Sequence, residues 1–269
     1  MIDNELPLQL YHLVGDSVRC YRVKPAEHLA AYIYYYWWLD VAPGDTKLEV
    51  IPDNAIDLVM SPDIPNFSIL YLPTSEKFSI PLSGPVTYLG ICFRASNTGD
   101  FFNVGNARMN SCLPGTNTTD ILSINSLVNE VQEIKQADQM ASVLDALLVS
   151  RLNEQPTTVS DASNLNIDKA LAAMQASVGT HGMETIASHF DLSDRQFRRI
   201  MGSLFGYGPK KIQRVMRLQS SLKEIFTADA LNIEHGFYDE AHKIKEIRAL
   251  TGLTPGQIKR MSETYNSLL

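Results

Sequence analysis

The chain has 269 residues, of which 45% are hydrophobic and 20% are charged, and its formal net charge at pH 7 is −7. This composition indicates a globular protein of one large or two ordinary domains. No apolar run approaches the roughly 18 residues of a membrane span, and the N-terminal stretch MIDNELPLQL lacks the basic and apolar regions of a signal peptide. The cysteines Cys20, Cys92 and Cys112 are scattered, which fits a reduced cytoplasm and excludes a zinc site built on four cysteines.

The region before about residue 115 is rich in Tyr, Ile, Val, Pro and Gly and is interrupted by short turns such as Ala42–Asp45, which predicts a mostly β domain. Its run YIYYYWW, at 32–38, is apolar on both faces of the expected strand. Alternation places one set of side chains, Tyr34, Tyr36 and Trp38, opposite another, Ile33, Tyr35 and Trp37. Such a strand packs against core on both sides, or contributes aromatic side chains to a ligand pocket or a dimer contact.

Two helical segments follow the β region. Apolar residues recur every three or four positions in Thr119–Lys135 and in Asp138–Leu152, so each expected helix has an apolar stripe that covers its own domain or joins two subunits. The stretch QPTTVSDASN, at 155–164, is polar and aperiodic and contains a proline, as in a linker. We therefore expect an N-terminal domain at 1–155, a linker at 156–165 and a C-terminal domain at 166–269.

The region after the linker has helical periodicity throughout. A short amphipathic helix ends at Phe190, Asp191 takes a turn, and Ser193 is the expected N-cap of a second helix. The apolar stripe of that second helix consists of Phe197, Ile200, Met201, Leu204 and Phe205. At about 100° per residue, Arg195 and Arg199 point away from the stripe and Arg198 lies on its flank. Two helices joined by a tight turn, with a basic outer face, form a helix-turn-helix unit, whose second helix lies in the DNA major groove.

The basic charge is concentrated in this part of the chain. Residues 166–269 hold 14 Lys and Arg against 11 Asp and Glu, whereas residues 1–165 hold 9 against 19. Within Ser193–Arg217 there are seven basic residues and one acidic residue. A local basic stripe of this kind is typical of a nucleic-acid interface even in an acidic protein.

The pattern then recurs. A long helix at Pro209–Phe226 is followed by Thr227 as a cap, a short helix to His235, a turn, and a helix from Glu240 to about Leu250. The stretch GLTP, at 252–255, repeats the G-x-x-P of GYGP, at 206–209. This internal duplication of about 45 residues predicts two tandem helix-turn-helix units.

The segments LSDRQFRRIMGSLFGYGPKKIQRVMRLQ (192–219) and GFYDEAHKIKEIRALTGLTP (236–255) together resemble the DNA-binding domain of the AraC/XylS transcription regulators. YIYYYWWLD (32–40), IPDNAIDLVM (51–60) and GPVTYLGICFR (84–94) resemble, more weakly, the β-rich sensor domain of one branch of that family. The resemblance implies an α+β protein with a barrel-like β-rich N-terminal domain, two trailing helices and an all-α C-terminal domain. It also implies a cytoplasmic regulator that binds double-stranded promoter DNA.

Mapped onto this chain, the family's base-reading positions fall on Arg195, Arg198 and Arg199. The expected DNA-binding set also includes Gln196, Ser203, Lys210, Lys211, Glu240, His242, Lys243 and Lys245, and the expected effector-binding set is Tyr34, Tyr36, Trp38 and Tyr88. The second unit departs from the family pattern, with Asn232 in place of a small Ala and Lys243 in place of an apolar residue. Because Ile244 follows one position later, the second recognition helix is expected to be rotated by about 100°.

Enzymatic alternatives have little support in the sequence. Residues 1–165 contain only two histidines, His12 and His28, and their candidate pair for acid–base chemistry is Asp53 with Asp57. No G-x-S-x-G, phosphate-loop or dinucleotide motif occurs. We therefore expect a binding protein without catalytic residues, metal or cofactor. The N-terminal domain senses a small effector or acts through protein contact alone, and a homodimer would form through this domain.

Overall fold

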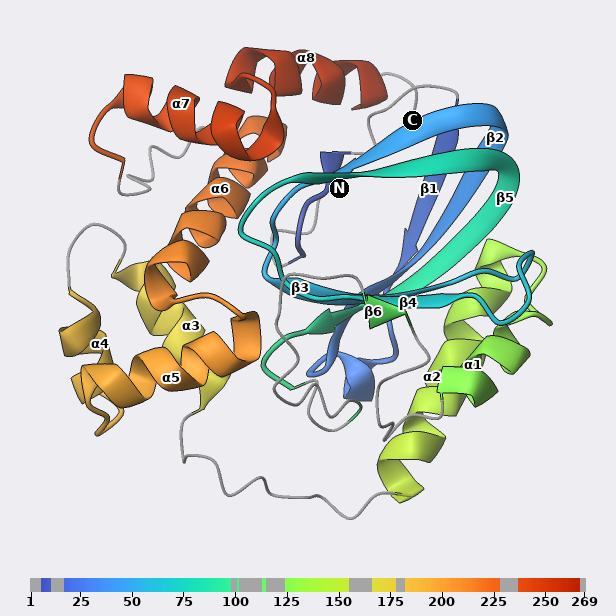
Figure 1. Cartoon of the computed structure of the whole chain (residues 1–269), viewed down its shortest axis with the longest axis horizontal. Coiled ribbons are helices and arrows are strands. Elements are labelled where there is room, and N and C mark those ends of the chain that lie inside the picture. Colours follow the sequence, from blue (N-terminus) through green and yellow to red (C-terminus); the bar gives the residue numbers. More distant parts are fainter. Residues whose placement is uncertain are drawn as a thin grey trace.

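The computed structural model describes residues 6–10, 17–97, 101, 113–114, 124–154, 166–177, 182–227 and 237–266. Its N-terminal half contains an antiparallel sheet and its C-terminal half contains helices (Figure 1). The sheet has the strand order β1 (Val18–Val23), β2 (Ile33–Val50), β5 (Phe78–Arg94), β3 (Ala55–Met60), β4 (Ser68–Tyr71) and β6 (Leu113–Pro114). A short 3-10 helix, η2 (Glu27–Leu29), precedes β2. The α+β class expected from the sequence is confirmed at this level.

β2 and β5 are long strands that bend together. The turn predicted at Ala42–Asp45 is wrong, because β2 continues through it with a register shift between Val41 and Gly44. Gly44 has a φ of 109°, which a residue with a side chain rarely adopts. On the facing strand, a Cβ at Gly84 would lie 2.1 Å from the carbonyl oxygen of Ala42. The Pro and Gly residues that suggest a turn therefore mark a bulge at which the paired strands curve.

A second register shift, between Ile33 and Tyr35, changes which side chains share a face. Ile33 packs in the same apolar cluster as Tyr36 and Trp38, whereas Tyr35 and Trp37 belong to the cluster on the other face. The predicted alternation is confirmed for Tyr35 to Trp38 and is wrong for Ile33 and for Tyr34, which packs against the cluster of Tyr35 and Trp37. A bulge adds one residue to the strand, so every side chain before it changes face.

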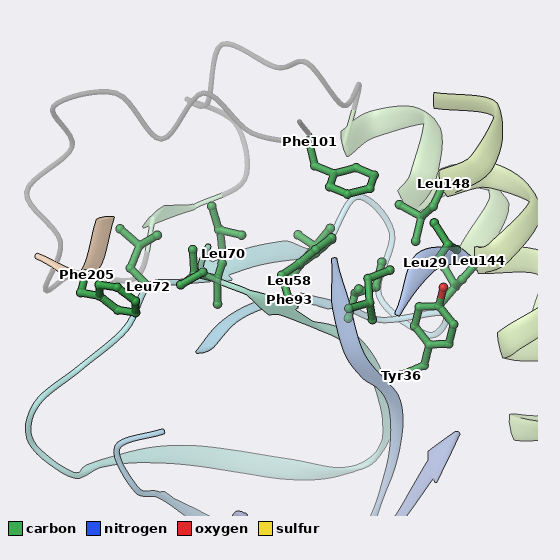
Figure 2. Close-up of a cluster of buried hydrophobic side chains, with 14 of the residues drawn as sticks. Leu29, Tyr36, Leu58, Leu70, Leu72, Phe93, Phe101, Leu144, Leu148 and Phe205 are labelled. Atoms are coloured by element: carbon green, nitrogen blue, oxygen red, sulfur yellow. The ribbon is translucent and has the colours of Figure 1, made fainter. Parts of the chain in front are cut away.

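Two helices, α1 (Ile124–Val131) and α2 (Ala137–Glu154), cover one face of the sheet (Figure 1). Figure 2 shows Leu144 and Leu148 of α2 beside Tyr36 and Leu29. The Tyr36 hydroxyl also donates a hydrogen bond of 2.7 Å to Oδ1 of Asp145. The apolar stripe predicted for Asp138–Leu152 thus packs on its own domain.

The C-terminal half contains α3 (Ile167–Ala176), α4 (Met183–Ser188), α5 (Asp194–Phe205), α6 (Pro209–Thr227), α7 (Glu240–Thr251) and α8 (Pro255–Asn266). In Figure 1, α6 runs from the group formed by α3, α4 and α5 to the group formed by α7 and α8. Gly206 and Gly252 follow α5 and α7 with φ of 75° and 81°, so the repeated G-x-x-P stretches end both helices in the same way. The predicted linker at 156–165 and the predicted short helix before His235 lie outside the described residues.

The two halves are in direct contact. Leu8 and Leu10 from the N-terminal segment join Ile51 in a buried apolar cluster with residues of the helical half, Leu218, Leu222, Ile247, Leu250 and Ile258. Figure 2 also shows Phe205 of α5 beside Leu72. Within the part of the chain that the structure describes, no helix is long and apolar enough to span a bilayer.

Candidate nucleic-acid interface and apolar cavity

Helix α5 begins at a complete N-terminal cap. Asp191 has a φ of 55° in the turn after α4, as a reversal of the chain requires. The Ser193 side chain accepts a hydrogen bond from the backbone N–H of Gln196, and the Gln196 side chain accepts one from the backbone N–H of Ser193. This reciprocal pair satisfies two backbone donors and fixes the direction in which α5 starts. The N-cap predicted at Ser193 is confirmed.

α5 has two opposite faces. Phe197, Met201 and Phe205 are buried with at most 1% of their surface exposed, whereas Arg195, Arg198 and Arg199 are exposed. Nε of Arg198 lies 2.6 Å from Oδ2 of Asp194, one turn earlier, and this hydrogen bond raises the pKa of the guanidinium. Arg195 and Arg199 form no ion pair with any described residue. Their guanidinium groups therefore remain available to an external acceptor.

Two other residues expected at the interface are occupied within α5 itself. The Gln196 side chain belongs to the N-terminal cap, and the Ser203 hydroxyl donates to the backbone carbonyl of Ile200 at 2.8 Å. Both side chains are exposed, but their hydrogen bonds within α5 hold them in fixed positions.

The basic residues at the start of α6 lie at the boundary with the sheet. Lys210 is exposed, while Nζ of Lys211 donates to the Ser75 hydroxyl at 3.3 Å. Nε of Arg214 lies 2.7 Å from Glu246 of α7, and its Nη1 lies 3.5 Å from Glu76 of the N-terminal half. Glu246 raises the pKa of Arg214, and the same hydrogen bond lowers the pKa of Glu246. Of the two α6 lysines expected at the interface, both are exposed, and Lys211 is the one bonded to the N-terminal half.

The rotation predicted for the second recognition helix is wrong. α7 buries Ile247, Leu250 and Thr251, and Lys243 lies on the same face, one turn before Ile247. Nζ of Lys243 is 3.1 Å from Oε2 of Glu224 on α6, and both side chains are less than a quarter exposed. Glu224 neutralises the ammonium group, so the helix keeps its register and Lys243 contacts α6 rather than solvent.

The exposed surface of α7 differs from the predicted one. Glu240 and Lys245 are exposed as expected, whereas His242 is half-buried, with Nδ1 accepting a long hydrogen bond of 3.4 Å from the backbone of Tyr238. Tyr238 and Ile244 are 93% and 39% exposed, which is unusual for apolar side chains of this size. Tyr238 is not among the residues expected at the interface, and Ile244, which the expected rotation would have turned toward the core, is exposed instead.

A cavity of about 210 Å³ lies on the face of the sheet that α1 and α2 leave uncovered. Its wall is mostly aliphatic and aromatic and is formed by Trp37, Leu39, Leu48, Val50, Val59, Phe67, Ile69, Tyr71, Phe78, Ile80, Pro81, Leu82 and Tyr88, with Gln9 and Asp57. Gly90 positions the Trp37 indole, because a Cβ at Gly90 would lie 2.2 Å from the indole ring. The glycine therefore allows a tryptophan to lie across the neighbouring strand and face the cavity.

The polar end of the cavity is a hydrogen-bonded group around two aspartates. Nε1 of Trp37 donates to Oδ1 of Asp57 at 2.8 Å, and Nε2 of Gln9 donates to Oδ2 of Asp53 at the same distance. Burial raises the pKa of both carboxyl groups, and the neighbouring Asp53 contributes to raising the pKa of Asp57 to about 7. Among the described residues, no three His, Cys, Asp or Glu side chains gather as a metal site would require.

Only one of the four residues expected to bind an effector lines this cavity. Tyr88 does, while Tyr36 and Trp38 lie in the cluster on the opposite face, bonded to Asp145 and Asp40. Tyr34 lies beneath the Arg94 guanidinium, which is 4.2 Å from its ring centroid. Alternation alone cannot say which face of a strand a helix covers, so an effector role for Tyr34, Tyr36 and Trp38 stays a prediction that this cavity does not support.

Comparisons with known proteins assign no role to these features. Residues 21–111 match the family described as "Domain of unknown function (DUF6597)", and no curated protein matches the chain.

Among solved structures, the chain is similar to ToxT from Vibrio cholerae O395, with 13% identity, 92% of this chain and 98% of that chain covered, and a TM-score of 0.41. A second ToxT structure from Vibrio cholerae has 12% identity, 91% and 97% coverage, and a TM-score of 0.43. Unsaturated fatty acid bound ToxT from strain SCE256 has 11% identity, 91% and 94% coverage, and a TM-score of 0.42. At such TM-scores the likeness carries no argument about function.

Proposed function

We propose that this chain is a transcription regulator that binds double-stranded DNA, with α4 and α5 as a helix-turn-helix unit and α5 in the major groove. The exposed arginine face of α5 carries this proposal. Arg195, Arg198 and Arg199 leave the helix opposite a fully buried apolar stripe, so they are free to contact a partner without loss of packing. A structural role for all three is disfavoured, because only Arg198 has an ion-pair partner among the described residues.

The chemistry of the exposed groups fits DNA. A guanidinium group can donate two parallel hydrogen bonds to O6 and N7 of guanine, which is the commonest specific contact in the major groove. Lys210, exposed at the start of α6, suits a phosphate contact that positions the helix. In this assignment Arg195 and Arg199 are the base-reading residues, and Arg198 is held by Asp194 beside them.

The second unit has a smaller part in the proposal. α7 offers Lys245, Arg248 and the apolar Ile244 to the outside, while Glu240 is an unfavourable charge near phosphate. Lys243 is not part of the proposed DNA contacts, because its ammonium group pairs with Glu224. The proposed interface is therefore dominated by the first unit.

The N-terminal domain completes the proposed regulator. An effector bound in the cavity beside Trp37, Tyr88 and Asp57 would be sensed by the sheet, which contacts the helical half directly. Pairing of two chains through the N-terminal domain, and the division at 156–165, remain predictions. The cavity favours a small-molecule effector over a domain that acts by protein contact alone.

Selection of bound sequences from random double-stranded DNA, followed by affinity measurements on the selected site, tests the proposal. The wild-type chain should enrich one sequence. Arg199→Ala should remove preference at one or two base positions, at a cost of about 1–3 kcal/mol for a bidentate contact. Arg19→Ala, which removes an exposed arginine of β1, is the matched control and should leave both preference and affinity unchanged.

Two results would count against the proposal. Failure of the wild-type chain to enrich any sequence would exclude sequence-specific binding. An equal loss of affinity for selected and random DNA in Arg199→Ala would show that Arg199 contacts only phosphate, and α5 would then not be the base-reading helix.

A further inference from the structure

The cavity wall holds a single charged side chain. Of the residues that line it, Asp57 is the only one that carries a charge when ionised at neutral pH; the others are apolar or aromatic, apart from Gln9. The Gln9 amide is already occupied, since Nε2 donates to the Ile51 carbonyl and to Asp53 while Oε1 accepts from the Ile51 N–H. Asp57 is thus the charged group of this wall that a ligand's polar end would meet.

Asp57 has capacity to accept a further hydrogen bond. It receives one from the Trp37 indole and one from the Cys92 thiol, whereas an ionised carboxylate can accept about four. Part of the Asp57 surface remains accessible, although the residues on either side of it in β3, Ile56 and Leu58, are fully buried. A donor entering through the cavity can therefore reach this carboxylate.

The charge balance around Asp57 favours a cation. The charged groups that act on it are Asp53, which is negative, and Arg22, which is positive. With both aspartates ionised the group has one excess negative charge, which a bound ammonium would neutralise. A bound carboxylate would instead double the excess in a buried site, where unpaired charge is costly.

The aromatic wall adds to this preference. Trp37, Phe67, Tyr71, Phe78 and Tyr88 all line the cavity. The Phe67 and Tyr88 rings lie 5.4 Å apart, and the Tyr71 and Phe78 rings are stacked at 5.7 Å. Ring faces attract cations, most strongly where water is excluded, and they also accommodate an apolar ligand body.

We infer that the cavity takes an amphiphilic organic amine, with its ammonium group against Asp57 and its apolar body among the aromatic side chains. This inference rests on the proposed effector role of the N-terminal domain and names the chemical class of that effector. It excludes carboxylates with the same apolar body.

Three probes that share one body test the inference on the full chain: 4-phenylbutylamine, 4-phenylbutan-1-ol and 4-phenylbutanoate. Binding is measured by calorimetry and by the shift in melting temperature at pH 8, where Asp57 is ionised. The amine should bind at least tenfold more tightly than the alcohol, and the carboxylate should give no shift. Amine affinity should fall by up to tenfold per pH unit below about 7, because a proton then occupies Asp57.

Asp57→Asn is the matched variant, since an asparagine oxygen can still accept from Trp37. It should remove the preference for the amine over the alcohol and the pH dependence of amine binding. If this variant does not fold, the affinities of the wild-type chain for the amine and for the alcohol, measured across pH, still test whether the ammonium group binds Asp57.

Equal or tighter binding of the carboxylate, a pH-independent affinity for the amine, or no binding of any probe would each overturn the inference. DNA affinity measured on the same preparation distinguishes a wrong ligand class from a wrong DNA-binding function. A chain that enriches a DNA sequence but binds no amine retains the DNA-binding role and loses only the assigned ligand class.

Discussion

Asp57 shows how burial changes the charge state of a single residue. Removal from water is the main cause of its raised pKa, and the neighbouring Asp53 adds to the effect, so the carboxyl group titrates near pH 7 instead of near 3.8. In the unfolded chain the proton is lost at the ordinary value. Between these two pH values the folded state therefore binds more protons than the unfolded chain. The stabilisation that this carboxyl group gives the folded state is fully present below about pH 3.8 and is lost as the pH rises through about 7.

We expect the free energy of unfolding of the wild-type chain to fall as the pH rises from about 4 to about 7, and Asp57→Asn to weaken this dependence. Denaturant unfolding at a series of pH values measures it. Asp45→Asn, which changes an exposed aspartate of β2, should keep the wild-type slope. Identical slopes for Asp57→Asn and the wild type would show that Asp57 is ionised throughout this range.

Lys243 is a residue whose surroundings reverse its expected role. Its ammonium group contacts Glu224 in a partly buried position between α7 and α6, so removing it leaves a carboxylate without its partner. We expect Lys243→Ala to lower the free energy of unfolding by about 1 kcal/mol.

In the same experiment Lys245→Ala, two residues along the helix and exposed, should leave stability unchanged. DNA affinity should respond in the opposite order, with the larger loss for Lys245→Ala. If Lys243→Ala lost more DNA affinity than Lys245→Ala and its stability were unchanged, the Lys243 side chain would contact DNA.

At the scale of an element, α5 is an amphipathic helix whose start is set by its cap. Ser193 and Gln196 exchange hydrogen bonds across the first turn, which contains Arg195, and Arg198 and Arg199 lie in the turn that follows. The cap therefore fixes the direction in which the arginine face points.

Ser193→Ala should lower the free energy of unfolding by about 1 kcal/mol, the usual cost of losing a serine N-cap, and should weaken DNA binding through fraying of the first turn. Thermal unfolding and DNA affinity are the measurements. Ser203→Ala is the control on the same helix, because its hydroxyl bonds only to a carbonyl that is already part of the helix. Equal effects of the two substitutions would contradict a special role for the cap.

At the scale of the whole molecule, the side chain of Gln219 joins the two halves. Its Oε1 accepts from the Leu8 N–H, and its Nε2 donates to the carbonyls of Leu8 and Pro52. The same N-terminal segment carries Gln9, which lines the cavity and bonds to Asp53. The cavity and α6 therefore contact two successive residues of one short segment.

Gln219→Ala should cost about 1–3 kcal/mol, because it leaves buried backbone groups without partners. It should also separate the unfolding of the two halves into two calorimetric transitions. Gln213→Ala is the matched control, since this glutamine bonds within the helical half, to the carbonyl of Met174. A single transition in Gln219→Ala would show that the apolar cluster of Leu8 and Leu10 couples the halves without the amide.

The features determined by the sequence alone depend on residues close together in the chain. The cap at Ser193, the glycine ends of α5 and α7 and the exposed arginine face of α5 all follow from neighbours within about four positions, the span over which helix signals act. Strand-forming and turn-forming residues also act over a few neighbouring positions. The mostly β character of the region before about residue 115 could therefore be predicted.

Tertiary structure decided the rest. The bulge that moves Ile33 to the other face, the placement of the cavity beside Trp37, and the pairing of Lys243 with Glu224 all depend on partners brought together by folding. The bond between Leu8 and Gln219 joins residues 211 positions apart. No local pattern encodes such a partner, because the free energy of a buried polar or charged group is set by what surrounds it in the folded chain.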